Sequence, residues 1–420
     1  MFVNFANVCI FVCLNLTEKY KQKMKRILTL LVAVLMATVV SAQSLEKAKP
    51  ESVGMNPKML EEADRLIAEA AAKKDFPGAV FAVVRHGKLV HLAAFGDKQW
   101  LPEKAPMKKN TIFDLASVSK PTSTAVCMMI LVERGKIRLT DKVKDYLPGF
   151  KGYATEKGDT IDIRIADLLT HSSGLLAYAP VATVVEQGGA NPKALLDYIK
   201  TCPRSFAPKS RFRYSCLNFI SLQHILEAVT GQTISEFAQQ NVFDVLGMKD
   251  TSYGPIVDKK KLSRVAPTEK QPDGTILLGS VHDPLARVLN HGNSGNAGVF
   301  STAEDLAILY AALLNGGEIN GHRIMGRLTV DKMFSVPENV KHLGRTLGWD
   351  SYSSYAGNKG DLFSSKAVCH TGYTGTSVVL DPENDVAMIL LTNAVHPSDS
   401  GRTGRLRSAV ANLVAGAIMD

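Results

Sequence analysis

The stretch that decides the fold is Ala79-Val-Phe-Ala-Val-Val84, a run of apolar residues that favours an extended strand. The pair His86-Gly87 follows it as a turn signal, and a second strand-like segment runs from Leu89 to Phe95. Two such segments joined by a short turn predict a β-hairpin near the start of the domain.

A second hairpin is predicted near the other end of the chain. Its strands are Thr376 to Leu380 and Val386 to Leu391, with a turn at Asp381 to Asp385 between them. Helical spacing of apolar residues is found at 56–72, 117–135, 165–169, 192–202, 218–231, 303–316 and 405–418. Strands at both ends with helices between them predict an α/β (α+β) fold. We expect one antiparallel sheet, built from both chain ends and flanked by helices, with an inserted helical subdomain.

The first 42 residues have a different pattern. The basic pair Lys25-Arg26 precedes an apolar run, 27–40, that is too short to span a bilayer, and a small-residue cleavage site ends at Ala42. These features predict a secretory signal peptide with its true start at Met24. An unusually long leader is the alternative, because residues 1–23 do not fit this plan. The protein is therefore expected to be exported, to the periplasm or outside the cell, with no stable membrane span after cleavage.

The composition of the 420-residue chain is that of a soluble globular protein, with 45% hydrophobic and 21% charged residues. We expect a single domain from 48 to 420. Removal of the leader lowers the net charge from +9 to +5, and no block of Lys and Arg interleaved with aromatics appears, so nucleic acid is not an expected partner. The four remaining cysteines are scattered and form no CxxC pair, which predicts free thiols. They are Cys127, Cys202, Cys216 and Cys369.

Several common catalytic signatures are missing from the sequence. It contains no G-x-S-x-G elbow, H-E-x-x-H motif, Walker loop or GxGxxG after a strand, and its histidines lack the spacing of metal ligands. A zinc hydrolase is therefore not expected.

The remaining motif is S-x-x-K, which occurs twice. The copy at Ser44 lies just after the predicted cleavage site and is attributed to chance. In Ser117-Val-Ser-Lys120 the first and last residues share a face of the predicted helix, whereas Ser119 points away. The positive helix N-terminus disfavours protonation of Lys120, so a neutral amine could take the proton of Ser117. The alternative is a helix that begins with a serine cap and carries a solvated lysine.

Five further stretches accompany this motif in order. They are Leu131 to Pro148, Leu168-Leu-Thr-His-Ser-Ser-Gly174, Phe212-Arg-Tyr-Ser215, Ala297-Gly-Val-Phe-Ser-Thr302 and His370-Thr-Gly372. Together they resemble the penicillin-binding-protein and class C β-lactamase family of serine hydrolases, which includes D-alanyl-D-alanine carboxypeptidases. The resemblance covers residues 48 to 420. It implies that Ser117 is the nucleophile and Lys120 its base.

The second catalytic element of that family is Tyr-x-Asn, which this sequence lacks. The best match is Tyr214-Ser215-Cys216, so the resemblance implies that Tyr214 shuttles protons and that Cys216 replaces the asparagine that binds the substrate amide. A thiol is a weak hydrogen-bond donor, which puts amide or β-lactam recognition in doubt. The rival Ser294-Gly295-Asn296 is ranked below Tyr214 and interpreted as a turn that supports the site.

The third element is Lys-Thr-Gly or His-Thr-Gly in the family. His370-Thr371-Gly372 leads directly into the C-terminal hairpin, and is preferred to Arg402-Thr-Gly404, which is expected in a loop. The resemblance implies that His370, Thr371 and Gly372 bind an anionic or polar group of the substrate. It also implies an oxyanion hole made by the main-chain N–H groups of Ser117 and Tyr373.

Two other histidine stretches receive a structural interpretation. The loop at His171-Ser-Ser-Gly174 is expected to support the site, and His282-Asp283 is expected at its rim, because Lys120 already supplies a base.

The expected reaction is attack by Ser117 on an acyl carbonyl, followed by release of the acyl-enzyme, with no metal or organic cofactor. The preferred substrates are D-Ala-D-Ala-type peptides of peptidoglycan or related small acyl compounds. A carboxylesterase or a β-lactamase on the same scaffold are alternatives, and a non-catalytic penicillin-recognising sensor is an alternative of another class.

Overall fold

The computed structural model describes residues 44–399 and 401–420. The predicted signal peptide, its cleavage site and the proposed start at Met24 lie outside the described residues. Within the described ranges, no helix combines the length and the apolar character that a membrane span requires.

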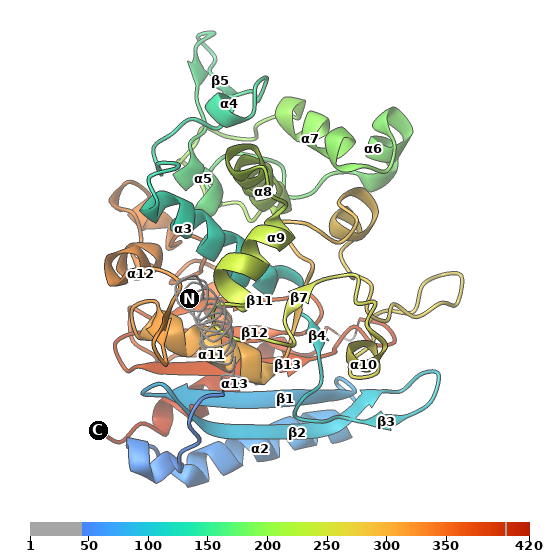
Figure 1. The fold of residues 1–420 in the computed structure, drawn as a ribbon, viewed down its shortest axis with the longest axis vertical. Coiled ribbons are helices and arrows are strands. Elements are labelled where there is room, and N and C mark those ends of the chain that lie inside the picture. The colour runs from blue at the N-terminus through green and yellow to red at the C-terminus, as the bar shows by residue number, and fades with distance from the viewer. Residues whose placement is uncertain (1–43, 400) are drawn as a thin grey trace, which may run out of the picture. The chain divides into compact units, whose positions relative to one another are not determined.

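A six-stranded antiparallel sheet forms the centre of the fold, in the order β11-β12-β13-β1-β2-β3 (Figure 1). Its strands are β1 (Gly78–Arg85), β2 (Lys88–Gln99), β3 (Ala105–Pro106), β11 (Val368–Thr371), β12 (Ser377–Asp381) and β13 (Val386–Thr392). Strand β1 pairs with β13, with Phe81 opposite Leu390. Both predicted hairpins are therefore confirmed, and they join in one sheet built from the two ends of the chain.

Strand β1 is buried along its whole length because helices cover both faces of the sheet. Val80, Ala82 and Val84 pack in the core that contains α11 (Ala303–Leu314) and α3 (Val126–Glu133). The alternate residues Ala79, Phe81 and Val83 pack in a second core, with α2 (Pro57–Ala72) and α13 (Gly404–Gly416). A strand covered on both faces has no solvent-exposed face that would carry polar side chains, which explains its continuous apolar sequence.

The middle of the chain forms the predicted helical part, which lies above the sheet in Figure 1. Its helices are α4 (Val143–Tyr146), α5 (Ile165–Leu169), α6 (Val181–Gly188), α7 (Pro192–Thr201), α8 (Cys216–Thr230), α9 (Ile234–Ala238), α10 (Lys259–Leu262) and α12 (Arg327–Phe334). The predicted helix 117–135 consists of three pieces: a 3-10 turn η2 (Ala116–Val118), a π-helical turn η3 (Lys120–Ala125) and α3. Short 3-10 and π turns recur at η1 (Pro50–Val53), η4 (Gln239–Phe243), η5 (Leu285–Leu289), η6 (Glu338–Leu343) and η7 (Ala356–Lys359).

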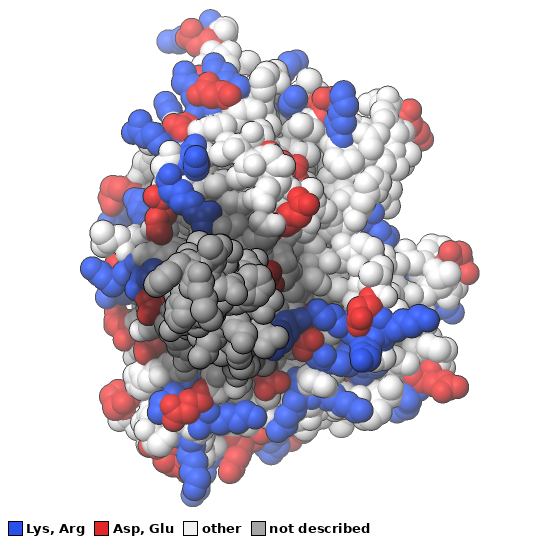
Figure 2. All heavy atoms as spheres, viewed as in Figure 1, with Lys and Arg blue, Asp and Glu red and all other residues white. Residues whose placement is uncertain are grey.

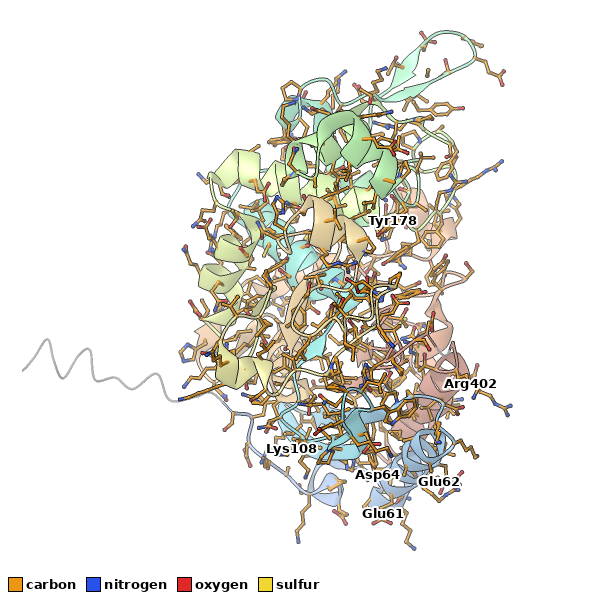
Figure 3. All side chains as sticks on the ribbon, turned by 90° about the vertical axis from the view of Figure 1, so that its right-hand side faces the viewer. Glu61, Glu62, Asp64, Lys108, Tyr178 and Arg402 are labelled. Carbon is orange, nitrogen blue, oxygen red and sulfur yellow. The ribbon has the colours of Figure 1, made fainter. Side chains whose placement is uncertain are left out.

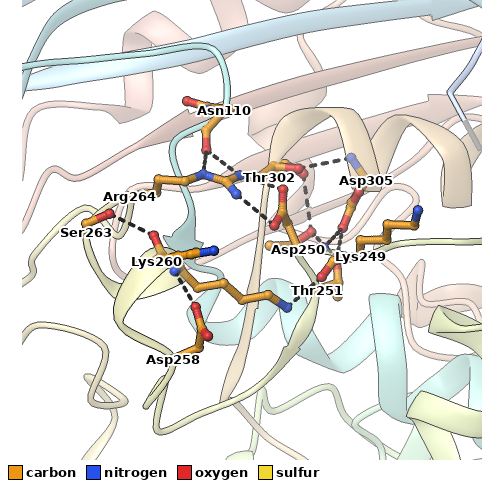
Figure 4. Close-up of polar contacts among 12 residues, drawn as sticks. Asn110, Lys249, Asp250, Thr251, Asp258, Lys260, Ser263, Arg264, Thr302 and Asp305 are labelled. Atoms are coloured by element: carbon orange, nitrogen blue, oxygen red, sulfur yellow. Dashed lines mark hydrogen bonds and ion pairs between the residues drawn. The ribbon is translucent and has the colours of Figure 1, made fainter. Parts of the chain in front are cut away.

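A small three-stranded sheet, β4-β8-β7, connects the helical part to the central sheet. Its strands are β4 (Phe113–Asp114), β7 (Ser252–Tyr253) and β8 (Val299–Ser301), and two-stranded ribbons form at β5 (Tyr153–Ala154) with β6 (Thr160–Ile161) and at β9 (Glu318–Ile319) with β10 (His322–Arg323). Figure 4 shows the polar contacts beside β7. Arg264 pairs with Asp250 and donates to the carbonyl of Asn110, while Thr251 donates to Asp305 of α11 at 2.8 Å. These contacts fix the segment that leads into β4, which in turn leads to Ser117.

Many charged side chains lie on the surface of this framework. Lys and Arg are interspersed with Asp and Glu on the face shown in Figure 2, without one sign covering it. In Figure 3, Glu61, Glu62 and Asp64 of α2 lie at the end of the molecule opposite Tyr178.

Candidate active site

A cavity of about 400 Å³ opens beside β11, the edge strand of the central sheet. It is lined by Ser117, Tyr214, Arg345, Asp350, Tyr355, His370, Thr371, Gly372, Tyr373, Asp399, Gly401, Thr403, Gly404 and Arg407. Six of the predicted site residues are in this lining. Lys120 and Cys216 are buried behind it. The structure thus brings together residues that are as far as 256 positions apart in the sequence, from Ser117 to Tyr373.

Ser117 lies on a strained turn. The residue before it, Ala116, has φ of +46°, in the left-handed region that non-glycine residues rarely adopt. Asp114 holds this turn: its carboxylate accepts from the main-chain N–H of Ala116 at 2.8 Å and from that of His282 at 2.7 Å. The hydroxyl of Thr374 donates to the Asp114 carbonyl at 2.8 Å. The turn is therefore fixed by contacts from distant parts of the chain.

Lys120 is fully buried, so the alternative of a solvated lysine is wrong. Its Nζ lies 3.0 Å from Ser117 Oγ and 2.8 Å from the main-chain oxygen of Asn296. Ser119 points away, as predicted, and its Oγ accepts from the N–H of Val299 at 3.1 Å. Ser44, of the other S-x-x-K motif, is exposed.

The protonation of Lys120 differs from the prediction. Burial on its own lowers the pKa of the Lys120 amine, but the Coulombic interactions with Cys216 and Tyr214 raise it, and the pKa is raised overall. The helix N-terminus was expected to lower the pKa of Lys120, and this is not supported. The helix begins with a short 3-10 turn, and the lysine has close polar neighbours. The raised pKa favours the protonated form of the Lys120 amine in the free site.

Tyr214 lies between the lysine and the cavity. Its ring centroid is 4.9 Å from Lys120 Nζ, and its buried hydroxyl makes no well-aligned hydrogen bond. Burial raises the pKa of Tyr214, while the nearby Lys120 lowers it in part. The ring also stacks against His171, with centroids 4.6 Å apart. His171 Nδ1 accepts from the main-chain N–H of Ser215 at 3.1 Å, which fits the supporting role predicted for this histidine.

Two side chains, Cys216 and Asn296, are candidates for the role of the substrate-binding asparagine that the sequence lacks. Cys216 Sγ is 3.7 Å from Lys120 Nζ, and burial raises the pKa of this thiol. Asn296 also borders the lysine through its main-chain oxygen, and its interaction with Cys216 shows that the two side chains are close. The Oδ1 of Asn296 accepts from Ser294 at 2.7 Å, whereas its buried Nδ2 makes no well-aligned hydrogen bond. Asn296 was expected only to support a turn, but it contacts the lysine directly.

His370 and Thr371 end strand β11 at the cavity, as expected of this tripeptide. The Nδ1–H of His370 donates to the carbonyl of Thr371 at 2.9 Å, so Nε2 is a bare acceptor, and it has no hydrogen-bond partner among the described residues. Burial, with the positive charges of Arg345 and Lys120, lowers the pKa of His370 well below its usual value. The imidazole is therefore neutral and carries no charge that could attract an anion.

Gly372 is required by close packing. A Cβ atom at this position would stand 2.1 Å from Thr376 Oγ1 and 2.4 Å from the main-chain oxygen of Leu115. The glycine thus lets β11 approach the turn that carries Ser117. In the rival tripeptide, Arg402 is exposed and lies within 3.4 Å of Asp75, and Figure 3 shows its side chain pointing outward.

His282 lies at the rim, as predicted. Its ring stacks on that of Tyr373, with centroids 5.5 Å apart, and its Nε2 is 3.3 Å from Glu269. Neither contact connects it to Ser117, so no Ser-His-Asp triad is formed.

Comparison with known proteins decides the family. The family model described as "Beta-lactamase" matches residues 63–412, which is most of the chain. The chain belongs to the β-lactamase family. The resemblance deduced from the motifs is therefore confirmed, and this is a family of hydrolases.

Two relatives show how closely this β-lactamase-family protein resembles others. It is 33% identical to the "N-acetylmuramyl-L-alanine amidase" of Bacillus subtilis (strain 168), over 82% of this chain and 83% of the relative. It is 31% identical to a protein of Escherichia coli (strain K12) that bears the name "Putative D-alanyl-D-alanine carboxypeptidase", over 89% and 92% of the two chains.

Solved structures confirm the fold of this family member. EstCE1, a hydrolase with promiscuous acyltransferase activity, superposes with a TM-score of 0.68 at 22% identity, covering 86% of this chain and 99% of its own. The octameric penicillin-binding protein homologue from Pyrococcus abyssi gives a TM-score of 0.65 at 21% identity, covering 85% and 77%.

Eight lining residues of this β-lactamase-family protein were not assigned to the site by sequence reasoning, and three of them have large side chains: Arg345, Tyr355 and Arg407. Arg345 is 1% exposed and pairs with Asp350, at 2.7 Å from Nη1 to Oδ2. Tyr355 stacks on Tyr214 with centroids 5.6 Å apart. Each stands alone in a segment without a catalytic motif, and only the folded chain reveals its position.

Proposed function

We propose that this protein is an exported serine hydrolase that acts through an acyl-enzyme on Ser117. The observation that carries the proposal is the 3.0 Å contact between Lys120 Nζ and Ser117 Oγ, with Ser117 open to the cavity and the lysine buried behind it. A nucleophile in hydrogen-bond contact with a buried base is the arrangement that covalent catalysis requires.

The chemistry follows from the positions of four groups. Once the pair formed by Lys120 and Tyr214 has lost one proton to solvent, Ser117 Oγ attacks an acyl carbonyl carbon and its own proton passes to this pair. The main-chain N–H groups of Ser117 and Tyr373 stabilise the developing oxyanion. Tyr214 returns the proton to the leaving group, and water then attacks the acyl-enzyme to release the product. No step requires a metal or an organic cofactor.

The proposed substrates are D-Ala-D-Ala-type peptides derived from peptidoglycan, or related small acyl compounds. The names of the two relatives, an amidase and a carboxypeptidase, support this class. The pKa of His370 is well below its usual value, so this side chain would meet an anionic or polar group of the substrate as a neutral imidazole.

A carboxylesterase is the second candidate, and Cys216 favours it. The thiol stands where an amide-binding asparagine is expected, and its Sγ lies 3.7 Å from Lys120 Nζ. Esters lack the N–H that such an asparagine would orient, so they are less affected by its loss. A β-lactamase is disfavoured for the same reason, and a non-catalytic sensor is disfavoured by the direct contact between Ser117 and Lys120.

Covalent labelling tests the nucleophile. Protein incubated with a fluorophosphonate is expected to gain one adduct by intact-mass spectrometry, and Ser117→Ala is expected to gain none. Ser44→Ala is the matched control, because this serine belongs to the other S-x-x-K motif and is exposed. An adduct that persists in Ser117→Ala contradicts the proposal.

A substrate panel tests the class. Release of D-alanine from D-Ala-D-Ala peptides supports the carboxypeptidase, turnover of p-nitrophenyl esters alone selects the esterase, and turnover of nitrocefin selects the β-lactamase. Export is tested by N-terminal sequencing of the protein recovered outside the cytoplasm, which is expected to begin at Gln43.

A further inference from the structure

Tyr355 is an exposed aromatic residue on the wall of the cavity. It is 58% exposed, so burial in a core does not explain its position. Its ring stacks on that of Tyr214, with centroids 5.6 Å apart and an angle of 11° between the planes. Phe212 packs against the same ring of Tyr355 at 82°, with centroids 5.4 Å apart. An exposed side chain thus lies in an ordered stack on the ring that the proposed reaction uses to carry a proton.

Aromatic packing holds the side chain of Tyr214. Its buried hydroxyl interacts with Ser117 and Lys120 but makes no well-aligned hydrogen bond with a described residue. His171 packs against the ring with centroids 4.6 Å apart, and Tyr355 lies nearly parallel to it. The direction of the hydroxyl therefore depends on the rings that pack against the phenol.

The segment that carries Tyr355 is attached to the edge strand of the central sheet. Asp350 pairs with Cys369 of β11 through two main-chain hydrogen bonds, of 3.0 and 2.8 Å. Ser353 Oγ donates to Asp350 Oδ2 at 2.8 Å and accepts from the main-chain N–H of Tyr355 at 3.2 Å. The position of Tyr355 is therefore set by the sheet, independently of the ring on which it stacks.

A stacked ring acts on a phenol in two ways. Offset-stacked aromatic rings stabilise each other beyond the area that they bury. The covering ring also keeps water from the phenol, which disfavours the charged phenolate. The ionisable groups that face Tyr214 from other segments are Lys120 of η3, Cys216 of α8, His171, and His370 of β11. Removal of Tyr355 leaves these groups in place and changes only the cover of the ring.

We propose that Tyr355 is a positioning residue of the active site, whose ring covers part of one face of Tyr214 and holds the phenol hydroxyl toward Ser117 and Lys120. The inference rests on the proposed function, because it concerns Tyr214 as the proton carrier of that reaction. Tyr355 itself transfers no proton.

Titration of Tyr214 by NMR tests the stack without relying on turnover. In a Ser117→Ala background, protein labelled with ¹³C at the tyrosine Cζ atoms gives a Tyr214 signal, which Tyr214→Phe identifies by its loss. We expect Tyr355→Ala to lower the pKa of Tyr214, because water then reaches the phenol and stabilises the phenolate. Tyr355→Phe keeps the ring and is expected to leave this pKa unchanged. Tyr352→Ala is the matched control, because this tyrosine is 51% exposed in the same segment but does not line the cavity.

Steady-state kinetics with Ser117 intact give the second readout. Loss of the aromatic pair in Tyr355→Ala is expected to lower kcat, measured at the pH optimum of each variant, about 2- to 10-fold with little change in KM. Tyr355→Phe is expected to restore kcat, and Tyr352→Ala to keep it. Unchanged kcat in Tyr355→Ala would overturn the proposal, and an accompanying rise in KM would make Tyr355 a substrate contact instead. A Tyr214 signal that titrates alike in Tyr355→Ala and its parent between pH 6 and 11 would also overturn it.

Thermal unfolding of each variant verifies that it is folded. Tyr355→Leu replaces Tyr355→Ala if that variant does not fold, since leucine keeps apolar volume at this position without a ring. The same directions of change in kcat and in the pKa of Tyr214 are expected from it.

The two proposals can fail separately. If Ser117 is not labelled by a fluorophosphonate but Tyr355→Ala still lowers the pKa of Tyr214, the nucleophile is wrong and the effect of Tyr355 on Tyr214 stands. If Ser117 is labelled and Tyr355→Ala changes neither kcat nor this pKa, the reverse holds.

Discussion

The amine of Lys120 lies 3.0 Å from the hydroxyl oxygen of Ser117, and the lysine is fully buried. An acid–base group in such contact contributes about 10²- to 10⁴-fold to a rate. Lys120→Met is therefore expected to lower kcat by about this factor on any substrate that wild-type protein hydrolyses. Lys47→Met, in the exposed S-x-x-K motif, is the control and is expected to keep full activity. A Lys120→Met variant that retained more than a tenth of the wild-type kcat would show that the lysine is not the base.

The pH dependence follows from the same pair. The pKa values of Lys120 and Tyr214 are both raised, so near neutral pH both groups carry their protons and neither can accept one from Ser117. The active base appears only when the pair loses a proton, and this fraction grows as the pH rises. We expect kcat/KM to increase about tenfold per pH unit from pH 6 toward the alkaline range.

A steady-state pH profile between pH 6 and 10 makes this measurement. His171 and His370 have pKa values well below 6.5 and contribute no change between pH 6 and 7. A profile that is flat above pH 6 would mean that the base is already free in the resting site.

The sequence predicts the framework well because its signals are local and periodic. The apolar run at Ala79 to Val84 and the turn after it define a hairpin without reference to the rest of the chain. The helix that carries Ser117 is the exception. A single helix was predicted there, whereas the chain passes through a 3-10 turn and a π turn before α3 begins. The tertiary contacts of Asp114 with His282 fix this irregular start, and no local pattern encodes them.

The site is predicted only where residues belong to a motif. Ser117, Lys120 and Tyr214 are brought together as expected, but Arg345 and Asn296 enter through long-range packing. The protonation states of His370 and Lys120 were also not predicted, because their pKa values depend on burial and on side chains from other segments.

The close approach of Gly372 to the turn before Ser117 predicts a severe effect of one methyl group. In Gly372→Ala the new Cβ would meet Thr376 Oγ1 and the Leu115 carbonyl, so strand β11 must move away. Overpacking of this kind costs about 1–3 kcal/mol, and the displaced strand no longer aligns with the nucleophile. We expect a lower free energy of unfolding in urea and a kcat/KM reduced at least about tenfold. Gly357→Ala is the control: its Cβ would have open space around it, so neither the free energy of unfolding nor kcat/KM should change. Unchanged activity in Gly372→Ala would mean that the strand does not position the substrate.

The contact between Cys216 and Lys120 makes the choice between ester and amide substrates testable. Cys216→Asn introduces a strong N–H donor and a carbonyl acceptor at a buried position beside Lys120, where the present thiol lies 3.7 Å from the lysine and donates only weakly. A hydrogen bond to the substrate amide contributes about 0.5–1.5 kcal/mol. We therefore expect the ratio of kcat/KM for amide or β-lactam substrates to that for p-nitrophenyl esters to rise about 2- to 10-fold. Cys216→Ser is the control, because it keeps the size of the side chain without supplying an amide. If the ratio is unchanged in Cys216→Asn while Lys120→Met still abolishes turnover, the amide is bound by another group, and the unpaired Nδ2 of Asn296 is the next to replace.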